Sequence, residues 1–343
     1  ATMMKYPKEY LDEIKLRIKV SQVVGKSVKL KKRGKEFIGL SPFSNEKTPS
    51  FTVNDDKGFY HCFSSSEHGN IFDFLMKTKN YKFGEAVRTL ASEAGIPPYR
   101  FTKQDEERQN RWKIYNAILE KYVNFCYEEL VTGKYPEVIE YLNKRKTTKK
   151  EITFFKIGYA SSKEDFYEQL KKEFNEEQIN SSGIYYFDKN KKKYVDRFRN
   201  RIIFPLMDER NNPVGFAGRI FGTNDKKAAK YINSPASEAF DKSNFLYGLN
   251  QAVSSNRSLD CVYVHEGYLD VVACHQAGLT NNVACCGTAV TEKHLNKLFE
   301  YTDHVVFVFD GDEAGKKALK KTMYRALNCV TLKKHVSYCV LNS

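Results

Sequence analysis

The fold is decided by two segments, Val262-Tyr-Val-His-Glu266-Gly-Tyr-Leu-Asp270 and, further along the chain, Val305-Val-Phe-Val-Phe-Asp310-Gly-Asp312-Glu-Ala-Gly315. In each segment an apolar run ends in a carboxylate, a glycine follows, and a helical pattern begins. Near-continuous apolar runs of this length are typical of strands buried on both faces, as in parallel sheets. The stretch from Val262 to Lys320 therefore predicts a parallel sheet with crossover helices.

The segments around these two runs complete the alternation of strands and helices. The sequence predicts helices over 268–278, 291–301 and 313–327, a short strand over 282–286 and a further strand over 336–341. Ligands of an open parallel sheet collect at the carboxyl ends of its strands. We therefore expect Glu266, Asp310 and Asp312 to lie together at that edge.

Clustered carboxylates repel one another, by roughly 4 kcal/mol for two unit charges about 4 Å apart at an effective dielectric constant of 20. A divalent cation makes such a cluster tolerable, and oxygen-only ligands suit Mg²⁺ or Mn²⁺ better than zinc. A magnesium ion held in this way keeps positions for phosphate oxygens, as phosphoryl transfer requires. Alternatively, Asp310 and Asp312 form a solvated turn with an N-cap. The matching upstream motif at Glu266 favours the metal site.

The motifs Glu266-Gly-Tyr-Leu-Asp270 and Asp310-Gly-Asp312 resemble the Toprim module, which bacterial primases, topoisomerases and some nucleases share. The resemblance implies that Glu266, Asp310 and Asp312 bind the metal and that these residues and Asp270 are catalytic. The flanking segments 270–278 and 287–291 resemble the bacterial replicative DNA primases of the DnaG type.

Composition restricts the possible partners. The chain has 343 residues, a net charge of +14 and a pI near 9.2, which favours a polyanionic partner such as nucleic acid, although a soluble protein rich in lysine would look the same. Eight cysteines without regular spacing indicate a reducing, cytoplasmic setting. No apolar run of about 18 residues occurs, so we expect no membrane span.

The first hundred residues alternate basic and aromatic side chains. The sequence predicts a helix over 6–24, a hairpin over 28–40 turning at Arg33-Gly34, strands over 51–53 and 58–63, and helices over 71–78 and 83–94. This interleaving is typical of a sheet that binds single strands. Equally, the aromatic residues could form the core and the lysines could simply be solvated.

The segments Ser41-Pro-Phe-Ser44 and Tyr60-His-Cys-Phe63 resemble the N-terminal zinc ribbon of the same primases. The resemblance places the four zinc ligands at Ser41, Ser44, Cys62 and Ser65. Serine does not replace a zinc thiolate. We therefore expect no zinc here, a ribbon held by its aromatic residues, and retention of the DNA-binding role.

Prolines 97 and 98 and the polar run 102–109 mark a domain boundary. We predict a zinc-ribbon-like domain that binds single-stranded DNA at 1–101, a linker at 102–111, the N-terminal part of a catalytic core at 112–255 and an incomplete Toprim part at 256–343. The fold class is therefore multidomain, α+β and α/β. Within the core we expect helices over 112–131 and 135–144 and a small helical unit over 154–160 and 166–174.

Arg197, Arg199 and Arg201 alternate in sequence, so in a strand they would share one face. Three arginines on one face repel one another unless an anion, such as a nucleic-acid backbone or a triphosphate, lies over them. A turn at 211–213 and a strand over 214–220 follow. The resemblance to the primases implies that nucleotide or DNA is bound by Arg145, Arg197, Arg199, Arg201, Arg219, Lys230, Asn233 and Lys242, with Ser243 departing from the family's usual glycine.

The primase family carries a third acidic motif and a helicase-binding domain beyond the position of Ser343. The sequence therefore resembles a C-terminally truncated member. The resemblance implies a DNA-directed RNA polymerase of the bacterial replisome that makes short RNA primers, with single-stranded DNA, ribonucleoside triphosphates and the replicative helicase as partners. The alternatives are another Toprim enzyme, a nuclease or topoisomerase, and a non-catalytic protein that binds single-stranded DNA.

Overall fold

The computed structural model describes residues 6–163, 166–256 and 258–342. Contacts within the chain divide it into two compact units, Ala1–Arg108 with Ala252–Asp260, and Gln109–Gln251 with Cys261–Ser343. Every helix in the described parts is too short or too polar to cross a bilayer. The eight cysteines are all free thiols.

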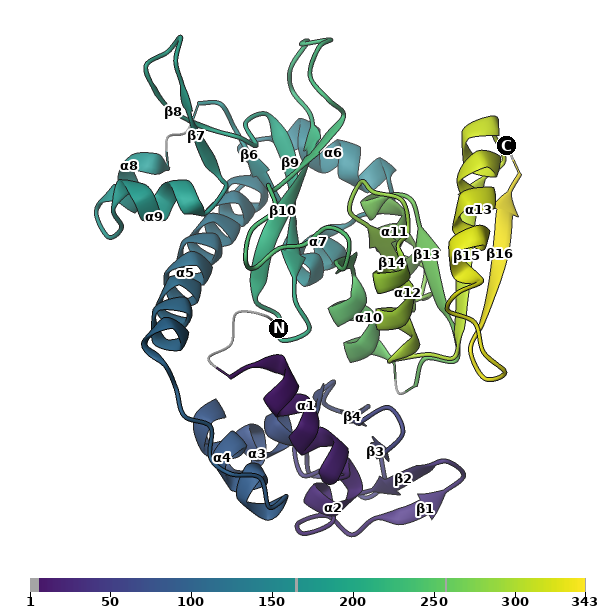
Figure 1. Ribbon diagram of the computed structural model, residues 1–343. Coiled ribbons are helices and arrows are strands. Elements are labelled where there is room, and N and C mark those ends of the chain that lie inside the picture. The colour runs from purple at the N-terminus through teal and green to yellow at the C-terminus, as the bar shows by residue number, and fades with distance from the viewer. Residues whose placement is uncertain (1–5, 164–165, 257, 343) are drawn as a thin grey trace. The chain divides into compact units, whose positions relative to one another are not determined.

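The first unit is built on a five-stranded antiparallel sheet, drawn in purple in Figure 1. Its strands run in the order β1 (Lys31–Arg33), β2 (Glu36–Gly39), β3 (Phe51–Asn54), β4 (Phe59–Cys62) and β5 (His68–Gly69), and its helices are α1 (Lys8–Arg17), α2 (Val20–Val24), α3 (Ile71–Lys79) and α4 (Phe83–Glu93). The predicted hairpin, the two strands after it and the two helices are confirmed.

The single helix predicted over 6–24 is wrong, because the chain forms α1 and α2 with a break between them. Ile18 has an extended backbone, and the Lys19 amide donates to Gln22 Oε1 at 2.9 Å, which caps the start of α2. The break turns the second apolar segment so that Ile14, Ile18 and Val24 all reach one core.

Aromatic rings fill the core of this unit. Phe51, Tyr60 and Phe74 are fully buried, with ring centroids 5.4 to 6.2 Å apart. The basic residues of β1 are exposed. The alternative that the aromatic residues are core therefore holds for these three rings, which cannot stack on bases.

The second unit contains two antiparallel sheets and one mainly parallel sheet. The first sheet has the order β11 (Tyr231–Asn233), β10 (Pro213–Ile220), β9 (Arg201–Met207) and β6 (Gly158–Ala160), and β7 (Tyr185–Asp188) pairs with β8 (Lys193–Asp196). Helices α5 (Lys103–Val131), α6 (Pro136–Lys144), α7 (Lys149–Phe155), α8 (Tyr167–Lys171) and α9 (Glu176–Ser181) accompany them.

One prediction for this part is wrong. The segment 154–160 is not helical throughout, because Gly158–Ala160 pairs with β9 as strand β6. A Cβ at Gly158 would lie 2.5 Å from the backbone of Cys126, so only glycine lets this strand approach α5 so closely. The segment 102–111, which was predicted as a linker, is helical as the beginning of α5, and the division between the two units after Arg108 falls inside it. Thr102 and Asp105 cap this helix reciprocally, each backbone amide donating to the other side chain.

The third sheet is the one predicted from the opening segments. Its order is β12 (Leu246–Tyr247), β14 (Asn282–Cys285), β13 (Val262–His265), β15 (His304–Asp310) and β16 (His335–Leu341), with α10 (Leu249–Ser255), α11 (Tyr268–Gln276), α12 (Glu292–Phe299) and α13 (Glu313–Ala326). All its pairings are parallel except that of β12, which sequence reasoning missed. The predicted α+β and α/β architecture is confirmed.

Asp196 is a partly buried residue at the end of β8. Its Oδ2 accepts from the Tyr122 hydroxyl at 2.7 Å and its Oδ1 from the Phe198 amide at 2.7 Å. Burial raises the pKa of Asp196 from 3.8 to about 6, although these hydrogen bonds and the charge of Arg199 act in the opposite direction. The folded protein therefore keeps a proton that the unfolded chain releases at lower pH.

We expect this group to make the protein less stable as the pH rises from about 4 to about 6, since the folded pKa lies above the unfolded one. The shift corresponds to about 3 kcal/mol of unfolding free energy, fully present below pH 4 and lost above pH 6. Urea unfolding of the parent and of Asp196→Asn across this range isolates the effect. Parallel stability curves for the two proteins would contradict the prediction.

Candidate active site

Glu266, Asp310 and Asp312 lie at the carboxyl-terminal edge of the parallel sheet, where they were predicted, and Asp270 lies nearby in the helix that follows β13. Glu266 directly follows β13, and Asp310 is the last residue of β15. Asp312 is the N-cap of α13, and Asp270 lies in the first turn of α11. Since β13 and β15 pair in parallel, both strands deliver their carboxylates to the same edge.

The neighbouring acids act electrostatically on Glu266. Burial raises the pKa of Glu266, and the charges of Asp310, Asp312 and Asp270 raise it further, in that order. The ionised form of Glu266 is thus disfavoured by its neighbours. A bound cation would remove that penalty.

The geometry of the site limits how a cation would be held. Among the described residues, no group of three or more His, Cys, Asp or Glu side chains stands close enough together to hold a metal ion. Asp312 Oδ1 accepts from the Gly315 amide at 2.7 Å, so the N-cap alternative is correct for Asp312. The donor set consists of oxygen alone and its charges repel, which is the donor chemistry that hard divalent cations prefer, so Glu266, Asp310 and Asp312 are the residues that would hold one. The metal site stays a prediction.

The turn between β15 and α13 depends on two close approaches. A Cβ at Gly311 would lie 2.5 Å from the Leu341 carbonyl oxygen, and one at Gly315 would lie 2.1 Å from the Asp310 carbonyl oxygen. Real Cβ atoms essentially never make contacts that short. The glycines therefore set the backbone on which Asp310 and Asp312 stand.

A second cluster gathers three of the predicted basic residues around two tyrosines. The Arg219 guanidinium lies over the Tyr141 ring at 4.7 Å, and Arg145 Nη1 donates to the Tyr141 hydroxyl at 3.2 Å. Lys230 Nζ lies 6.0 Å from the Tyr231 ring centroid. Sequence reasoning gave the tyrosines no role, although Tyr141 stands four residues before Arg145, a helical spacing that brings side chains together.

Arg219 has a polar atom without a partner. Its Nε is buried and makes no hydrogen bond within the described chain. Its Nη1 donates to the Ile220 carbonyl at 3.0 Å. A buried guanidinium donor without an acceptor is unfavourable unless a ligand supplies one. An anion over this cluster would do so.

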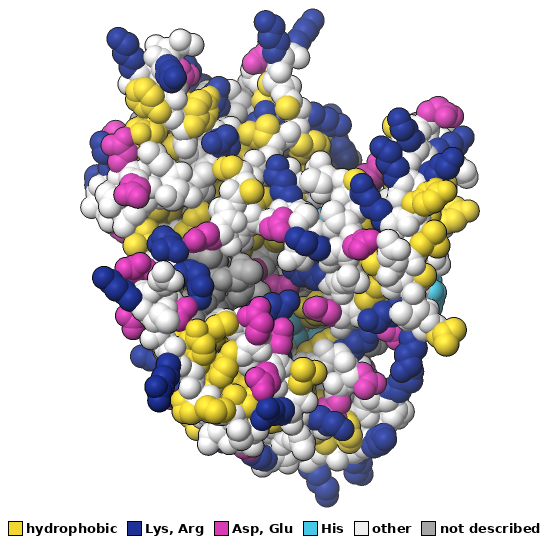
Figure 2. All heavy atoms as spheres, viewed as in Figure 1, with side chains coloured by type: hydrophobic (Ala, Val, Ile, Leu, Met, Phe, Trp, Pro, Cys, Tyr) yellow, Lys and Arg dark blue, Asp and Glu magenta, His cyan; other side chains and the backbone are white. Residues whose placement is uncertain are grey.

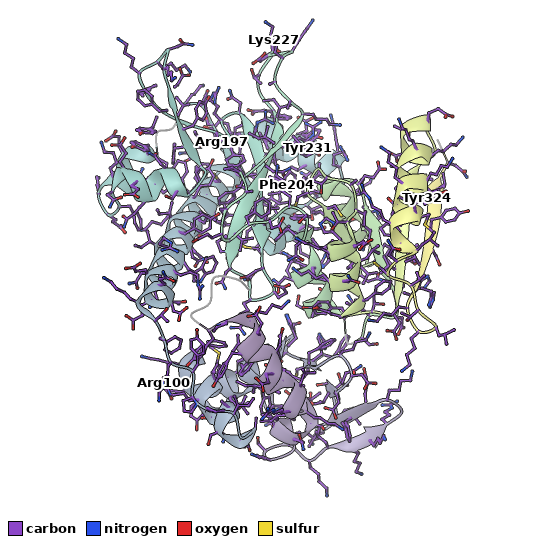
Figure 3. The ribbon with its side chains drawn as sticks, in the orientation of Figure 1. Arg100, Arg197, Phe204, Lys227, Tyr231 and Tyr324 are labelled. Carbon is purple, nitrogen blue, oxygen red and sulfur yellow. The ribbon has the colours of Figure 1, made fainter. Side chains whose placement is uncertain are left out.

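Asn233 links the basic cluster to the parallel sheet. Its Oδ1 accepts from the Tyr268 hydroxyl at 2.9 Å, and its Nδ2 donates to the Cys286 carbonyl at 3.3 Å. The Tyr268 ring contacts Phe204 and Tyr231, with centroids 5.5 and 5.6 Å away, and Figure 3 labels these two neighbours. Asn233 and Tyr268 therefore fix β11 against α11, which begins two residues after Glu266.

The interpretation of Arg197, Arg199 and Arg201 as one strand face is wrong. Only Arg201 lies in a strand, and residues 197–200 form a turn after β8. The Asp196 carboxylate accepts from the amide of Phe198 and so bends the chain there. All three guanidinium groups donate to the protein itself: Arg197 to the Gly183 carbonyl, Arg199 to the Tyr186 hydroxyl and Arg201, which is buried, to the Gly218 and Lys230 carbonyls.

Lys242 lies in the segment that precedes β12. Its backbone carbonyl accepts from His294 Nε2 at 2.9 Å, which ties the segment before β12 to α12. His294 is fully buried, and burial lowers its pKa, so the neutral ring is the favoured form. The predicted role of the Lys242 side chain stays a prediction.

The positions assigned to zinc ligands in the first unit come together around Cys62. The Cys62 thiol donates to Ser41 Oγ at 3.0 Å and lies 3.3 Å from Ser64 Oγ, which in turn lies 2.9 Å from Ser44 Oγ. Burial acts to raise the pKa of Cys62, but its hydrogen bonds with Ser41, Ser64 and Ser65 lower that pKa below its usual value. Hydrogen bonds thus connect the loops at this end of the sheet.

Three family models match the chain. They are the CHC2 zinc finger over residues 6–107, the DNA primase catalytic core, N-terminal domain, over residues 125–253, and a Toprim-like model over residues 263–337. These matches confirm the zinc-ribbon-like, core and Toprim assignments. They also weaken the expectation that zinc is absent, because the matched model is that of a zinc finger.

Curated relatives are DNA primases. The chain is 37% identical over 326 residues to the DNA primase of Lactococcus lactis, with 94% of this chain and 50% of the relative covered. It is 36% identical over 340 residues to that of Escherichia coli K12, with 95% of this chain and 56% of the relative covered. The chain thus spans about half the length of the curated relatives it matches.

The solved structures that resemble this chain are also primases. A DNA primase domain from Pseudomonas aeruginosa is 32% identical with a TM-score of 0.62, covering 67% of this chain and 71% of that one. The zinc-binding and RNA polymerase domains of the Aquifex aeolicus primase are 29% identical with a TM-score of 0.62, covering 97% of this chain and 79% of that one. A DnaG primase catalytic domain bound to ssDNA is 30% identical with a TM-score of 0.62, covering 68% and 75%.

We expect the purified protein to carry much less than one zinc per chain, because three of the four ligand positions are serine. Metal analysis by mass spectrometry measures the content, and thermal unfolding with and without a chelator should give the same midpoint. As a control, Ser41→Cys, Ser44→His and Ser65→Cys together restore a four-ligand set and should bind one zinc. One tightly held zinc in the unaltered protein would refute the prediction.

Proposed function

The chain belongs to the bacterial DNA primase family, and from this premise we propose that it synthesises short RNA primers on single-stranded DNA by metal-dependent nucleotidyl transfer. One observation carries the proposal. The parallel strands β13 and β15 bring Glu266 and Asp310 to one edge of the Toprim sheet, and Asn233 and Tyr268 join that edge to the arginine-tyrosine cluster. The acidic groups suited to a metal and the basic groups suited to phosphates are thus connected through the Asn233–Tyr268 hydrogen bond.

Each group has a role in this proposal. Glu266, Asp310 and Asp312 would hold Mg²⁺ or Mn²⁺, which when bound supplies activation of the primer hydroxyl and neutralises the triphosphate. Arg219 and Arg145, held by Tyr141, bind phosphate oxygens, and Lys230 adds a further positive charge beside them. Asp270 adds negative charge next to Glu266. Because the attacking group is a 3′-hydroxyl of nucleic acid, no side chain attacks covalently.

The partners follow from the same proposal. We propose single-stranded DNA as template, ribonucleoside triphosphates as substrates, the replicative helicase as a further partner and the bacterial cytoplasm as the setting. The first unit binds the template through its exposed basic hairpin β1–β2. The choice of template is supported by the similar DnaG primase catalytic domain, which was solved bound to ssDNA.

The proposal is tested by primer synthesis on single-stranded DNA with labelled ribonucleotides and Mg²⁺ or Mn²⁺. The assay is run on this chain and on one extended with the additional sequence of the Lactococcus lactis relative, because the chain spans half of that relative. Synthesis by either protein supports the proposal. Cleavage of DNA without incorporation of nucleotide would instead favour a Toprim nuclease or topoisomerase.

A second candidate, a non-catalytic protein that binds single-stranded DNA, has one observation in its favour. The Asp312 carboxylate accepts a hydrogen bond from the Gly315 amide, and no three of the described His, Cys, Asp or Glu side chains lie close enough together to hold a metal ion. Salt-dependent binding without synthesis by either protein, unchanged in Glu266→Gln, would select this candidate.

A further inference from the structure

Helix α13 carries more positive charge than its own stability favours. It has five basic residues, Lys316, Lys317, Lys320, Lys321 and Arg325, and one acidic residue, Glu313. Like charges four residues apart on a helix destabilise it. In the described chain Lys316 pairs with Glu313 at 3.8 Å, whereas Lys317, Lys320 and Lys321 make no ion pair. These three charges are therefore available to an external anion.

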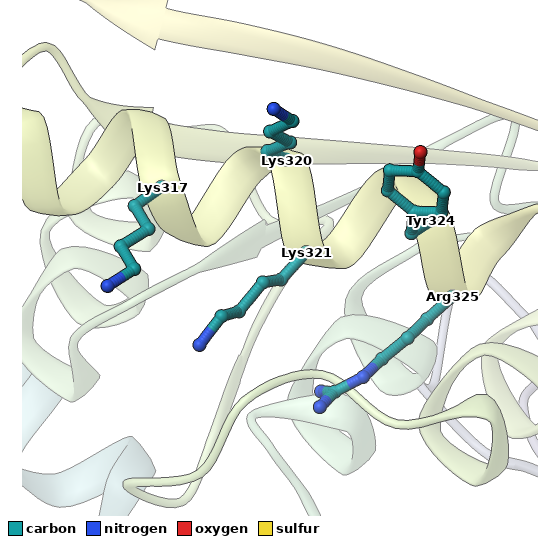
Figure 4. Close-up of a pocket in the computed structure, with 5 residues that line it drawn as sticks. All are labelled: Lys317, Lys320, Lys321, Tyr324 and Arg325. Carbon is teal, nitrogen blue, oxygen red and sulfur yellow. The ribbon is translucent and has the colours of Figure 1, made fainter.

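The basic side chains of α13 form two rows. Lys317, Lys321 and Arg325 extend to one side of the helix, while Lys320 and Tyr324 extend to the other (Figure 4). Residues four apart on a helix are about 6 Å apart along its axis, which is on the order of the spacing between successive phosphates of a nucleic-acid strand. Together the five side chains line a shallow cavity of about 650 Å³.

The far end of the first row is anchored. Arg325 Nη1 donates to the Val290 carbonyl at 2.6 Å, which holds the guanidinium against the segment before α12. The side chains of Lys317 and Lys321 can move toward a ligand, whereas the Arg325 guanidinium is held in place by its hydrogen bond. Arg325 is therefore left unchanged in the variants below.

An exposed aromatic ring accompanies the charges. Tyr324 is 70% exposed and Leu327 is 68% exposed, so both project into solvent from a helix whose buried face holds Gly315, Thr322 and Ala326. Figure 2 shows Lys and Arg side chains next to hydrophobic ones along α13, and Figure 3 labels Tyr324 there. Basic residues interleaved with exposed aromatic rings are typical of proteins that bind single strands, because each base can stack on a ring.

The position of α13 gives these features a function. The helix begins directly after Asp312, so Lys317 lies about 8 Å along the axis from the candidate active site and Arg325 about 12 Å further. We propose that α13 is a binding surface for single-stranded nucleic acid, with phosphates along Lys317, Lys321 and Arg325 and a base on Tyr324. The proposed function supplies the identity of the polyanion, a strand that enters or leaves the carboxylate edge.

The charge part of the inference is tested with the double variant K317Q/K321Q. Binding of a fluorescent oligodeoxythymidylate is measured by anisotropy at several salt concentrations. Each lost phosphate contact should reduce the slope of log K against log salt by about 0.7, so the double variant should lose about 1.4. The matched control K171Q/K172Q removes two exposed lysines of α8 and its C-cap and should keep the parent slope. An unchanged slope in K317Q/K321Q overturns the inference.

The stacking part is tested at Tyr324. Tyr324→Ala should weaken binding of the oligonucleotide by about five-fold or more, since one stacked base contributes at least about that factor. Tyr324→Phe should retain the affinity, and an abasic strand should bind the parent and Tyr324→Ala equally. Equal loss with the abasic strand would show that the ring does not stack on a base.

Two further results separate this inference from the proposed function. In the unaltered protein, Lys317 and Lys321 should be protected from acetylation when the oligonucleotide is bound, a readout that needs no folded variant. Protection and a reduced slope in a protein that makes no primers would support the α13 surface and reject the primase activity. Primer synthesis with no protection and no change of slope would support the activity and reject the surface.

Discussion

Glu266→Gln is expected to abolish nucleotide incorporation, by on the order of a thousand-fold or more, while single-stranded DNA affinity stays within a few-fold. A cation in a phosphoryl-transfer site stabilises the transition state by several kcal/mol. A neutral amide in place of the Glu266 carboxylate would bind that cation more weakly. The arginine-tyrosine cluster does not involve Glu266, so binding is preserved. Incorporation of labelled ribonucleotide and anisotropy of a bound oligonucleotide are the two measurements.

A matched control is available in the residue that follows Asp312. Glu313 lies in the first turn of α13 next to Asp312, and its side chain is 96% exposed. Glu313→Gln makes the same chemical change at a carboxylate that is not one of the proposed metal ligands. This variant should keep the activity of the parent. If Glu266→Gln lost binding in parallel with synthesis, the carboxylate would be structural.

The pKa of Glu266 also gives this variant a readout that does not depend on activity. Because the folded pKa is raised, first by burial and then by the neighbouring acids, ionisation of Glu266 lowers stability as the pH rises through that pKa. Glu266→Gln should therefore be at least as stable as the parent at neutral pH without metal. Added Mg²⁺ or Mn²⁺ should raise the melting temperature of the parent more than that of the variant.

The parallel sheet could be predicted because local signals and long-range packing agree there. The apolar run that ends at Asp310 is both a good strand and a largely enclosed one, and the glycines after it permit only a tight turn into a helix. The edge that collects Glu266 and Asp310 then follows from the parallel pairing of β13 and β15. Predicting this edge required no sequence outside the two segments that contain Glu266 and Asp310.

The arginine segment could not be predicted in the same way, because its conformation depends on a distant residue. Arg197 and Arg199 alternate like strand residues, but the Asp196 carboxyl, held by Tyr122 of α5, accepts from the Phe198 amide and makes a turn. Tyr122 lies 74 residues away in sequence. The pairing of Arg219 with Tyr141 likewise joins β10 to α6. Periodicity carries no information on such contacts.

Gly315→Ala should remove primer synthesis as completely as Glu266→Gln and should also destabilise the protein. A Cβ at position 315 would lie 2.1 Å from the Asp310 carbonyl oxygen and 3.0 Å from Asp312 Oδ1. The first neighbour is backbone, so the strand end or the first turn of α13 has to shift, at a cost of about 1–3 kcal/mol or more. Both movements displace carboxylates at the sheet edge. Urea unfolding and ribonucleotide incorporation measure the two effects.

The sign of the change in stability distinguishes steric crowding at Gly315 from the effect of helix propensity. At an unobstructed helical position, glycine to alanine stabilises by about 0.5–1 kcal/mol. Gly84 offers such a position, since a Cβ there would meet the end of the flexible Arg88 side chain at 3.2 Å and the Tyr6 hydroxyl at an ordinary contact distance of 3.8 Å. Gly84→Ala should therefore be neutral or stabilising, and the opposite sign at Gly315 would identify the Asp310 carbonyl as the obstacle. A stable, active Gly315→Ala protein would mean that the turn can relax without moving its carboxylates, and that the placement of Asp310 does not depend on this glycine.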